Sequence, residues 1–257
     1  MTNSNLLAAD GLALGYGAVP VVSELSFRLG QGDVLAVIGH NGSGKSTLIR
    51  TLLGGLDPLA GSLNWPLGRP RTIAYLGQRT EFDTRFPIRV RDLAAMGAWP
   101  GLGFFGRVNK TCRARIRAAL ERTGTVEIAD MPLHQLSAGQ LQRALFARTM
   151  VQDAQLILLD EPFTAIDQTT EADLLELIDS WSAEGRTIIM VLHDLTAVLQ
   201  HCSSALLLGK GQSLFGRPEA TLTPPNLVRH GYLSAGQASW IESMYQGRAA
   251  RQEAGHV

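Results

Sequence analysis

The chain has 257 residues, of which 45% are hydrophobic and 18% are charged, so its composition is that of a globular protein and excludes a disordered one. Its formal net charge is zero, which gives no reason to expect a nucleic-acid partner. The two cysteines lie far apart without metal-type spacing, which favours reduced thiols in a cytosolic protein.

The amino terminus lacks the basic and apolar regions of a signal peptide. No apolar stretch approaches the roughly 18–20 residues that are needed to span a bilayer. If the protein works at a membrane, we therefore expect another chain to supply the membrane part.

The first elements alternate short apolar stretches with glycine. Residues 1–32 predict antiparallel strands and a hairpin, and 33–39 predict a buried strand that runs into a glycine-rich turn. Residues 45–56 predict a helix that stops at a glycine pair, and 71–78 predict another strand.

The character of the sequence changes after these strands. Residues 80–108 are rich in Arg, Phe, Pro and Gly, and 110–124 predict an amphipathic helix. Ser137 stands in the N-cap position of a further helix that ends at about Gln152. We expect the stretch of about 80–150 to form an inserted helical subdomain.

Strands and helices then alternate again. The later elements are a strand at 155–160, a helix at about 170–184, a strand at 186–193, a helix at 194–201 and a last strand from 205 before a turn. This alternation predicts an α/β fold with a mostly parallel sheet. We expect one domain over residues 1–235 and a tail over 236–257.

One glycine-rich stretch carries the strongest chemical signal. "GHNGSGKST" (39–47) fits G-x-x-x-x-G-K-[ST] at every fixed position, after a strand and before a helix. The glycines let successive backbone N–H groups turn inward around phosphates, and the helix N-terminus adds partial positive charge. Lys45 would reach the β- and γ-phosphates, and the Ser46 hydroxyl would ligate Mg²⁺. The stretch comprises Gly39, His40, Asn41, Gly42, Ser43, Gly44, Lys45, Ser46 and Thr47.

Further polar residues stand at or next to predicted strands. Asp160 and Glu161 close "LILLDE", where neighbouring strand residues would point to opposite sides, Asp160 toward a metal and Glu161 toward a water. His193 and Gln78 each end a strand, which puts His193 on the ligand edge of a parallel sheet. Tyr16, between two glycines, could stack on a flat ring. Taken singly, each of these residues also fits an ordinary structural role.

In this order, with "LSAGQ" (136–140) and "TAID" (164–167), the motifs resemble those of the nucleotide-binding subunit of an ABC transporter over about residues 6–220. The resemblance implies a P-loop NTPase (RecA-like) core with an N-terminal antiparallel β subdomain, and hydrolysis of ATP with Mg²⁺. It also implies a head-to-tail dimer, an integral membrane permease as partner, and a peripheral location on the cytoplasmic face of the membrane.

The resemblance also implies a role for each motif residue. Tyr16 would stack on adenine, residues 39–47 would hold the phosphates, and Gln78 would contact Mg²⁺, the attacking water and the membrane subunit. Ser137, Gly139 and Gln140 would form the signature motif. Asp160 would organise Mg²⁺, and Glu161 would be the general base. Asp167 would contact the dimer partner, and His193 would be the switch histidine near the γ-phosphate. Ala138 departs from the commonest signature, which has glycine there, and "TAID" departs from Ser-Ala-Leu-Asp.

Residues 86–110 bear on the transported solute. They resemble the "FP-x-x-V-x-D-x-x-x-M-G" stretch and aromatic-glycine run of ATPases that serve zinc, manganese and chelated-iron importers. The expected function is to energise import of zinc or manganese, with an extracytoplasmic solute-binding protein as an indirect partner. Chelated iron, haem or another solute stays open, and so does a non-transport ATPase of the same superfamily.

Overall fold

The computed structural model describes residues 5–77, 87–99 and 109–238. The chain divides into two compact units. The first unit consists of residues 1–6, 29–34 and 65–192, and the second of residues 7–28, 35–64 and 193–257.

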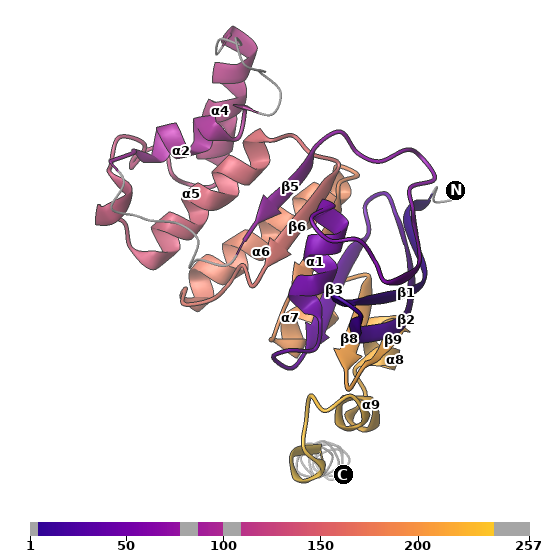
Figure 1. The fold of residues 1–257 in the computed structure, drawn as a ribbon. Helices are drawn as coiled ribbons and strands as arrows, with labels where there is room; N and C mark the ends of the chain where they lie inside the picture. Colours follow the sequence, from indigo (N-terminus) through magenta and orange to yellow (C-terminus); the bar gives the residue numbers. More distant parts are fainter. Residues whose placement is uncertain (1–4, 78–86, 100–108, 239–257) are drawn as a thin grey trace, which may run out of the picture. The chain divides into compact units, whose positions relative to one another are not determined.

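The first unit is built on three parallel strands (Figure 1). They are β5 (Ile73–Leu76), β6 (Leu156–Asp160) and β7 (Thr187–Val191), and β6 pairs with both of the others. Every residue of β6 and β7 is buried. These strands are continuous apolar runs rather than alternating ones because side chains cover both faces of a parallel sheet.

Three helices of the first unit follow β5 in the chain and pack against one another (Figure 1). They are α2 (Val90–Met96), α4 (Lys110–Arg122) and α5 (Ala138–Val151). The predicted helix at 110–124 is therefore confirmed, and it begins where Asn109 Oδ1 accepts a hydrogen bond of 2.8 Å from the Cys112 N–H. The proposed limits of the helical subdomain stay a prediction.

An aromatic pair joins α5 to α6 (Gln168–Ala183), the helix between β6 and β7. Phe146 stacks on Trp181 with ring centroids 5.8 Å apart and an interplanar angle of 20°. Both side chains are essentially inaccessible to solvent. Because paired buried rings contribute both apolar area and ring contact, this pair fixes the position of α5 beside α6.

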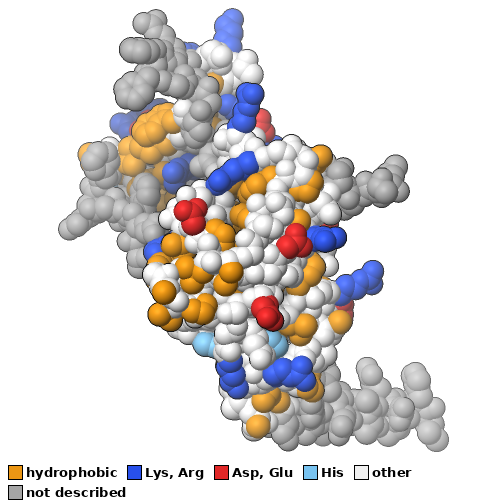
Figure 2. All heavy atoms as spheres, turned by 45° about the vertical axis from the view of Figure 1, so that its right-hand side comes forward, with side chains coloured by type: hydrophobic (Ala, Val, Ile, Leu, Met, Phe, Trp, Pro, Cys, Tyr) orange, Lys and Arg blue, Asp and Glu red, His pale blue; other side chains and the backbone are white. Residues whose placement is uncertain are grey.

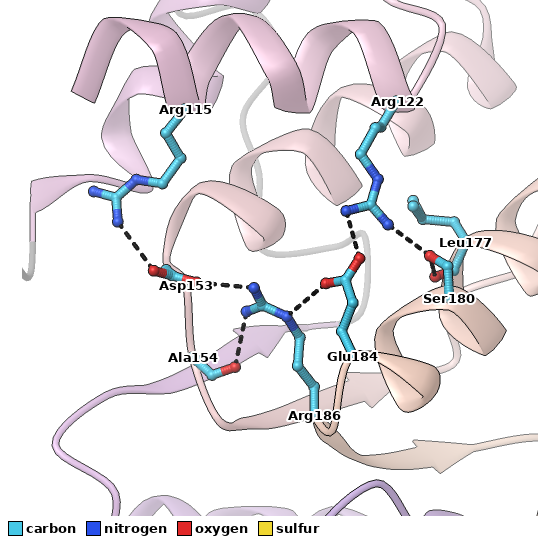
Figure 3. Close-up of polar contacts among 8 residues, drawn as sticks. All are labelled: Arg115, Arg122, Asp153, Ala154, Leu177, Ser180, Glu184 and Arg186. Carbon is cyan, nitrogen blue, oxygen red and sulfur yellow. Dashed lines mark hydrogen bonds and ion pairs between the residues drawn. The ribbon is translucent and has the colours of Figure 1, made fainter. Parts of the chain in front are cut away.

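A polar network ties α4 to the loops that precede β6 and β7 (Figure 3). Arg186 lies at its centre and donates to Asp153 at 2.8 Å and to Glu184 at 3.2 Å. Each carboxylate also meets an arginine of α4: Arg115 lies 3.4 Å from Asp153, and Arg122 lies 2.8 Å from Glu184. The two loops and α4 are thus held by alternating charges.

Backbone and hydroxyl groups complete this network. Arg186 also donates to the carbonyl of Ala154 at 3.1 Å, and Arg122 donates to Ser180 Oγ at 2.6 Å (Figure 3). The Arg186 side chain is only 22% exposed. Its removal would leave each carboxylate with one arginine instead of two and would take the Arg186 donor from the Ala154 carbonyl.

The second unit contains two groups of strands. β3 (Val34–Gly39) pairs in parallel with β8 (Ser204–Gly209), which pairs in antiparallel with β9 (Gln212–Gly216). A separate antiparallel sheet has the order β2-β1-β4. Its strands are β1 (Asn5–Tyr16), β2 (Val19–Gly30) and β4 (Ala60–Asn64), and the helices of this unit are α1 (Lys45–Leu53), α7 (Leu195–His201), α8 (Pro218–Thr221) and α9 (Pro224–Arg229).

The predicted hairpin at 1–32 is confirmed by β1 and β2, and the helix at 45–56 ends at the glycine pair as expected, with Gly54 in a left-handed conformation. Two predictions were wrong: the strand from 205 is not the last, because β9 follows it, and β7 ends at Val191 rather than at residue 193. The strand β4 was not predicted. β4 and β9 are partly or fully exposed and carry no apolar run, so no periodic signal marks them.

The surface is mixed in character. Figure 2 shows acidic and basic side chains scattered over one face among hydrophobic and uncharged ones. This agrees with the zero net charge of the chain. The prediction that nucleic acid is not a partner remains a prediction.

The Arg186 network predicts a stability effect. Arg186→Met keeps the length of the side chain but removes its hydrogen bonds to two carboxylates and a carbonyl, so we expect the free energy of unfolding to fall by about 1–3 kcal/mol. Arg117→Met is the matched control, because Arg117 is 81% exposed and pairs with Glu121 alone. Urea denaturation of both variants measures the difference, and equal midpoints would contradict the importance of the network.

Candidate functional site

The phosphate loop lies in the second unit, between β3 and α1. All of β3 is buried, which fixes where the loop begins. Gly42 and Gly44 have φ values of 81° and 100°, a region that side-chain-bearing residues rarely adopt. A Cβ on Gly44 would also lie 2.5 Å from Val22 Cγ2. Glycine is therefore required at position 44 for two reasons: the turn needs a left-handed backbone, and Val22 of the neighbouring strand leaves no room for a side chain.

Lys45 closes over this loop. Its side chain is buried, and Nζ donates to the carbonyl oxygens of Gly39 at 2.7 Å and His40 at 3.1 Å. The Ser43 hydroxyl is buried and has no hydrogen-bond partner among the described residues. A buried ammonium group, an unsatisfied hydroxyl and the start of a helix without acidic residues in its first turn form a donor set that fits a phosphate.

The remaining residues of the phosphate loop differ in their exposure to solvent. Ser46, the predicted Mg²⁺ ligand, is exposed in the first turn of α1, whereas Thr47 is buried. His40 and Asn41 are exposed and joined by a contact of 2.8 Å between His40 Nδ1 and the Asn41 carbonyl. The Ser46 hydroxyl oxygen is a hard donor of the type that Mg²⁺ prefers, so the loop fits a magnesium-bound phosphate chain.

Tyr16 is the last residue of β1 and is 49% exposed. Its hydroxyl accepts a hydrogen bond of 3.2 Å from Arg50 of α1. An exposed ring anchored by its hydroxyl leaves apolar surface for a flat ligand. Its contact with adenine stays a prediction.

His193 lies in the same unit but not in a strand. It stands two residues beyond the end of β7 and one residue before Asp194, the N-cap of α7. Its side chain is exposed, and its carbonyl oxygen accepts a hydrogen bond of 2.8 Å from the Tyr232 hydroxyl. The prediction that it closes the strand was wrong, because the pairing of β6 with β7 ends at Val191.

The signature stretch lies in the first unit, at the start of α5. The predicted N-cap is confirmed: Ser137 Oγ accepts a hydrogen bond of 3.2 Å from the Gln140 N–H. Gln140 Oε1 accepts one of 2.9 Å from the Ser137 N–H, which completes a reciprocal capping box. The first turn of α5 contains no acidic residue. No acidic side chain of α5 itself therefore opposes an anion at its positive end.

Gly139 brings the signature next to Asp167. Gly139 is buried, and a Cβ there would lie 3.0 Å from Thr170 Oγ1 and 3.5 Å from Asp167 Oδ2. Asp167 caps α6 by accepting from the Thr170 N–H and Oγ1, both at 2.9 Å. These two hydrogen bonds, the backbone one first, hold the pKa of the Asp167 carboxyl below its usual range. Asp167 is thus a fixed anion next to α5.

Asp160 and Glu161 differ because the strand ends between them. Asp160 is the last residue of β6 and is 9% exposed. Glu161 follows in a left-handed conformation with φ of 51°. The expectation that strand alternation separates the two carboxylates was wrong, because Glu161 lies outside the strand. A left-handed residue in this position turns the chain sharply, and such strain is common at functional sites.

The structure divides the predicted site residues between the units. The phosphate loop, Tyr16 and His193 lie in the second unit, and Asp160, Glu161, the signature and Asp167 lie in the first. Gln78 lies outside the described residues, and so do residues 86 and 100–108 of the predicted coupling stretch at 86–110. Thr170 and Tyr232 were not predicted. Thr170 stands at the third position after a capping Asp, a recognisable signal, whereas nothing in the sequence singles out Tyr232.

Two searches of the described residues bear on partners and metals. None of the helices in this part of the chain has the length and apolar character needed to cross a membrane. Across the same residues, no group of three or more His, Cys, Asp and Glu side chains is arranged to hold a metal ion.

Known proteins resemble this chain in sequence and in fold. The chain matches the ABC transporter family over residues 22–164. It is 39% identical over 204 residues to the zinc transport ATP-binding protein TroB of Treponema pallidum, covering 77% of this chain and 76% of that protein. It is 32% identical over 231 residues to the manganese transport ATP-binding protein MntB of Halalkalibacterium halodurans, covering 88% and 92% of the two chains.

A solved structure agrees with these relatives. An ABC transporter described as of metal-chelate type, in an inward-facing conformation, superposes with a TM-score of 0.81 at 30% identity, over 90% of each chain. The predicted α/β fold with a P-loop NTPase core is thereby confirmed. The chain belongs to the ABC transporter family, as an ATP-binding subunit that hydrolyses ATP.

Proposed function

We propose that this subunit energises the import of a metal ion, zinc or manganese, through a separate membrane permease. The observation that carries the proposal is the similarity to zinc and manganese transport ATP-binding proteins over about three quarters or more of the chain. The likeness to a metal-chelate-type transporter supports chelated metal as the second candidate. The imported ion would be chosen by the other subunits, and an extracytoplasmic solute-binding protein would deliver it.

The proposed assembly is a head-to-tail dimer on the cytoplasmic face of the membrane. The phosphate loop of one copy would hold ATP, and the α5 N-terminus of the other copy would face its γ-phosphate. Two features of α5 support this arrangement. Ser137 and Gln140 each accept a hydrogen bond from the other's backbone N–H, and no acidic side chain in the first turn would repel the phosphate. Asp167, held beside Gly139, would contact the partner copy.

Hydrolysis would proceed by in-line attack of water on the γ-phosphorus, with ADP as the leaving group. Glu161 would accept the proton of the attacking water, and His193 would donate a hydrogen bond to the γ-phosphate. Ser46, Asp160 and Gln78 would hold Mg²⁺, which neutralises charge on the phosphate oxygens when bound. Lys45 would exchange its two loop carbonyls for phosphate oxygens, and Tyr16 would stack on adenine.

Growth under metal limitation tests the proposed function. We expect deletion of the gene to make growth depend on added zinc or manganese, and the intact gene to restore growth without it. The Glu161→Gln gene should not restore growth, although it yields a folded protein. Rescue of the deletion strain by an iron chelate alone would overturn the choice of ion in favour of the second candidate.

Lys45→Ala should weaken ATP binding by about 10- to 100-fold, because charge-assisted hydrogen bonds to the phosphates are lost. Titration with ATP by calorimetry measures the affinity, and thermal unfolding shows that the variant is folded. The control is Lys110→Ala, which removes an exposed lysine at the start of α4. Equal ATP affinities of the two variants would contradict the assignment of the loop.

Glu161→Gln should retain ATP binding and lose about 10²- to 10⁴-fold in turnover, the usual cost of removing a general base. Glutamine keeps the shape of the side chain in the left-handed conformation, so the effect reports chemistry rather than folding. Phosphate release measures turnover, and gel filtration with ATP should reveal an accumulated dimer. Glu176→Gln, an exposed change on α6, serves as the control. Wild-type turnover by Glu161→Gln would exclude it as the base.

A further inference from the structure

A residue near the carboxyl-terminal end of the described chain reaches back to the predicted switch histidine. The Tyr232 hydroxyl donates a hydrogen bond of 2.8 Å to the carbonyl oxygen of His193. The two residues are 39 positions apart in the chain. None of the motifs in the sequence includes this tyrosine, and both residues belong to the second unit.

The turn after α9 fixes the backbone of Tyr232. Gly231 adopts a left-handed conformation with φ of 71°, and its N–H donates to Val228 at 3.0 Å. The Tyr232 N–H then donates to the carbonyl of Leu227 at 2.8 Å. This pair of backbone bonds closes a helix C-terminus tightly. These bonds therefore give the backbone of Tyr232 a defined position.

The same turn is anchored on β8. His230 is buried, and its Nδ1 lies 2.9 Å from the carbonyl oxygen of Asn226. The backbone of His230 approaches Gly209, the last residue of β8, so closely that a Cβ on Gly209 would lie 1.9 Å from the His230 carbonyl oxygen. The turn that carries Tyr232 is consequently packed against the end of this buried strand.

The carbonyl that Tyr232 binds belongs to the residue just before the N-cap of α7. The first carbonyl of that helix to accept a backbone bond is that of Asp194, which takes the Val198 N–H at 3.3 Å, and the Asp194 side chain caps the Thr196 N–H at 2.8 Å. His193 precedes this cap and lies outside both flanking elements. A hydrogen bond to its carbonyl restrains the 193–194 peptide plane, and with it the backbone that carries the histidine side chain.

The Tyr232 hydroxyl must be protonated to donate this hydrogen bond. Partial burial, followed by the nearby negative charge of Asp194, raises the pKa of the Tyr232 hydroxyl above its usual value. The hydroxyl therefore remains protonated at neutral and mildly alkaline pH. It donates to the carbonyl throughout the range in which a histidine changes its charge.

We propose that Tyr232 is a positioning residue for ATP hydrolysis, which holds the backbone of His193 so that its imidazole meets the γ-phosphate. The proposal rests on the function proposed above for His193. In this proposal Tyr232 affects hydrolysis through the histidine and not as a catalytic group itself. The turn of residues 230–232 after α9 is thereby part of the machinery for turnover.

Tyr232→Phe tests this, because it removes the hydroxyl and keeps the ring. In the full-length chain we expect kcat for ATP to fall about threefold to tenfold, the worth of one hydrogen bond, with the ATP affinity unchanged. In a His193→Ala background the same change should have no further effect, because the group that Tyr232 positions is gone. An equal loss in both backgrounds would show that Tyr232 acts through general stability, and would overturn the proposal.

The two proposals fail in distinguishable ways. If His193→Ala keeps wild-type turnover, the proposed role of His193 fails. If His193→Ala collapses turnover while Tyr232→Phe retains it, only the positioning role of Tyr232 fails. Where the His193→Ala rate is too low to compare, amide NMR decides: Tyr232→Phe should shift the Asp194 amide resonance, whose nitrogen shares a peptide with the His193 carbonyl. An unmoved Asp194 resonance would overturn the proposal.

Discussion

The binding of a triphosphate requires positive potential at helix starts that carry no opposing negative charge. Both α1 and α5 begin without an acidic residue in the first turn, whereas α2 and α6 each contain one there. In α1 the helix start follows a glycine turn closed by a buried lysine, and in α5 it follows a reciprocal cap between Ser137 and Gln140. In the proposed dimer each helix would supply one half of an anion site.

The surrounding structure keeps these two helix starts in place. The end of β3 and the contact of Gly44 with Val22 fix the start of α1. The start of α5 is fixed by the close approach of Gly139 to Thr170 and by the stacking of Phe146 on Trp181. The charged network around Arg186 holds α4, which packs against α5. Core packing and surface charge thus both help to position the helix starts.

Local features of the site could be predicted from the sequence, and contacts between distant residues could not. The spacing of Ser137 and Gln140 is that of a capping box, and the glycine pattern of 39–47 specifies the turn by itself. An apolar pattern does not mark the residue at which pairing stops, so neither the left-handed Glu161 nor the end of β7 was foreseen. The bond from Tyr232 to His193 joins elements without any shared periodicity.

The central claim is that an active site is completed by the signature helix of a second copy. Mixing two inactive variants tests this most directly: Lys45→Ala, with a defective phosphate loop, and Ser137→Arg, with a defective signature. In a head-to-tail heterodimer one site combines the intact loop of one copy with the intact signature of the other, so the account predicts ATP turnover well above the sum of the separate variants. A mixture that shows only that sum would contradict it.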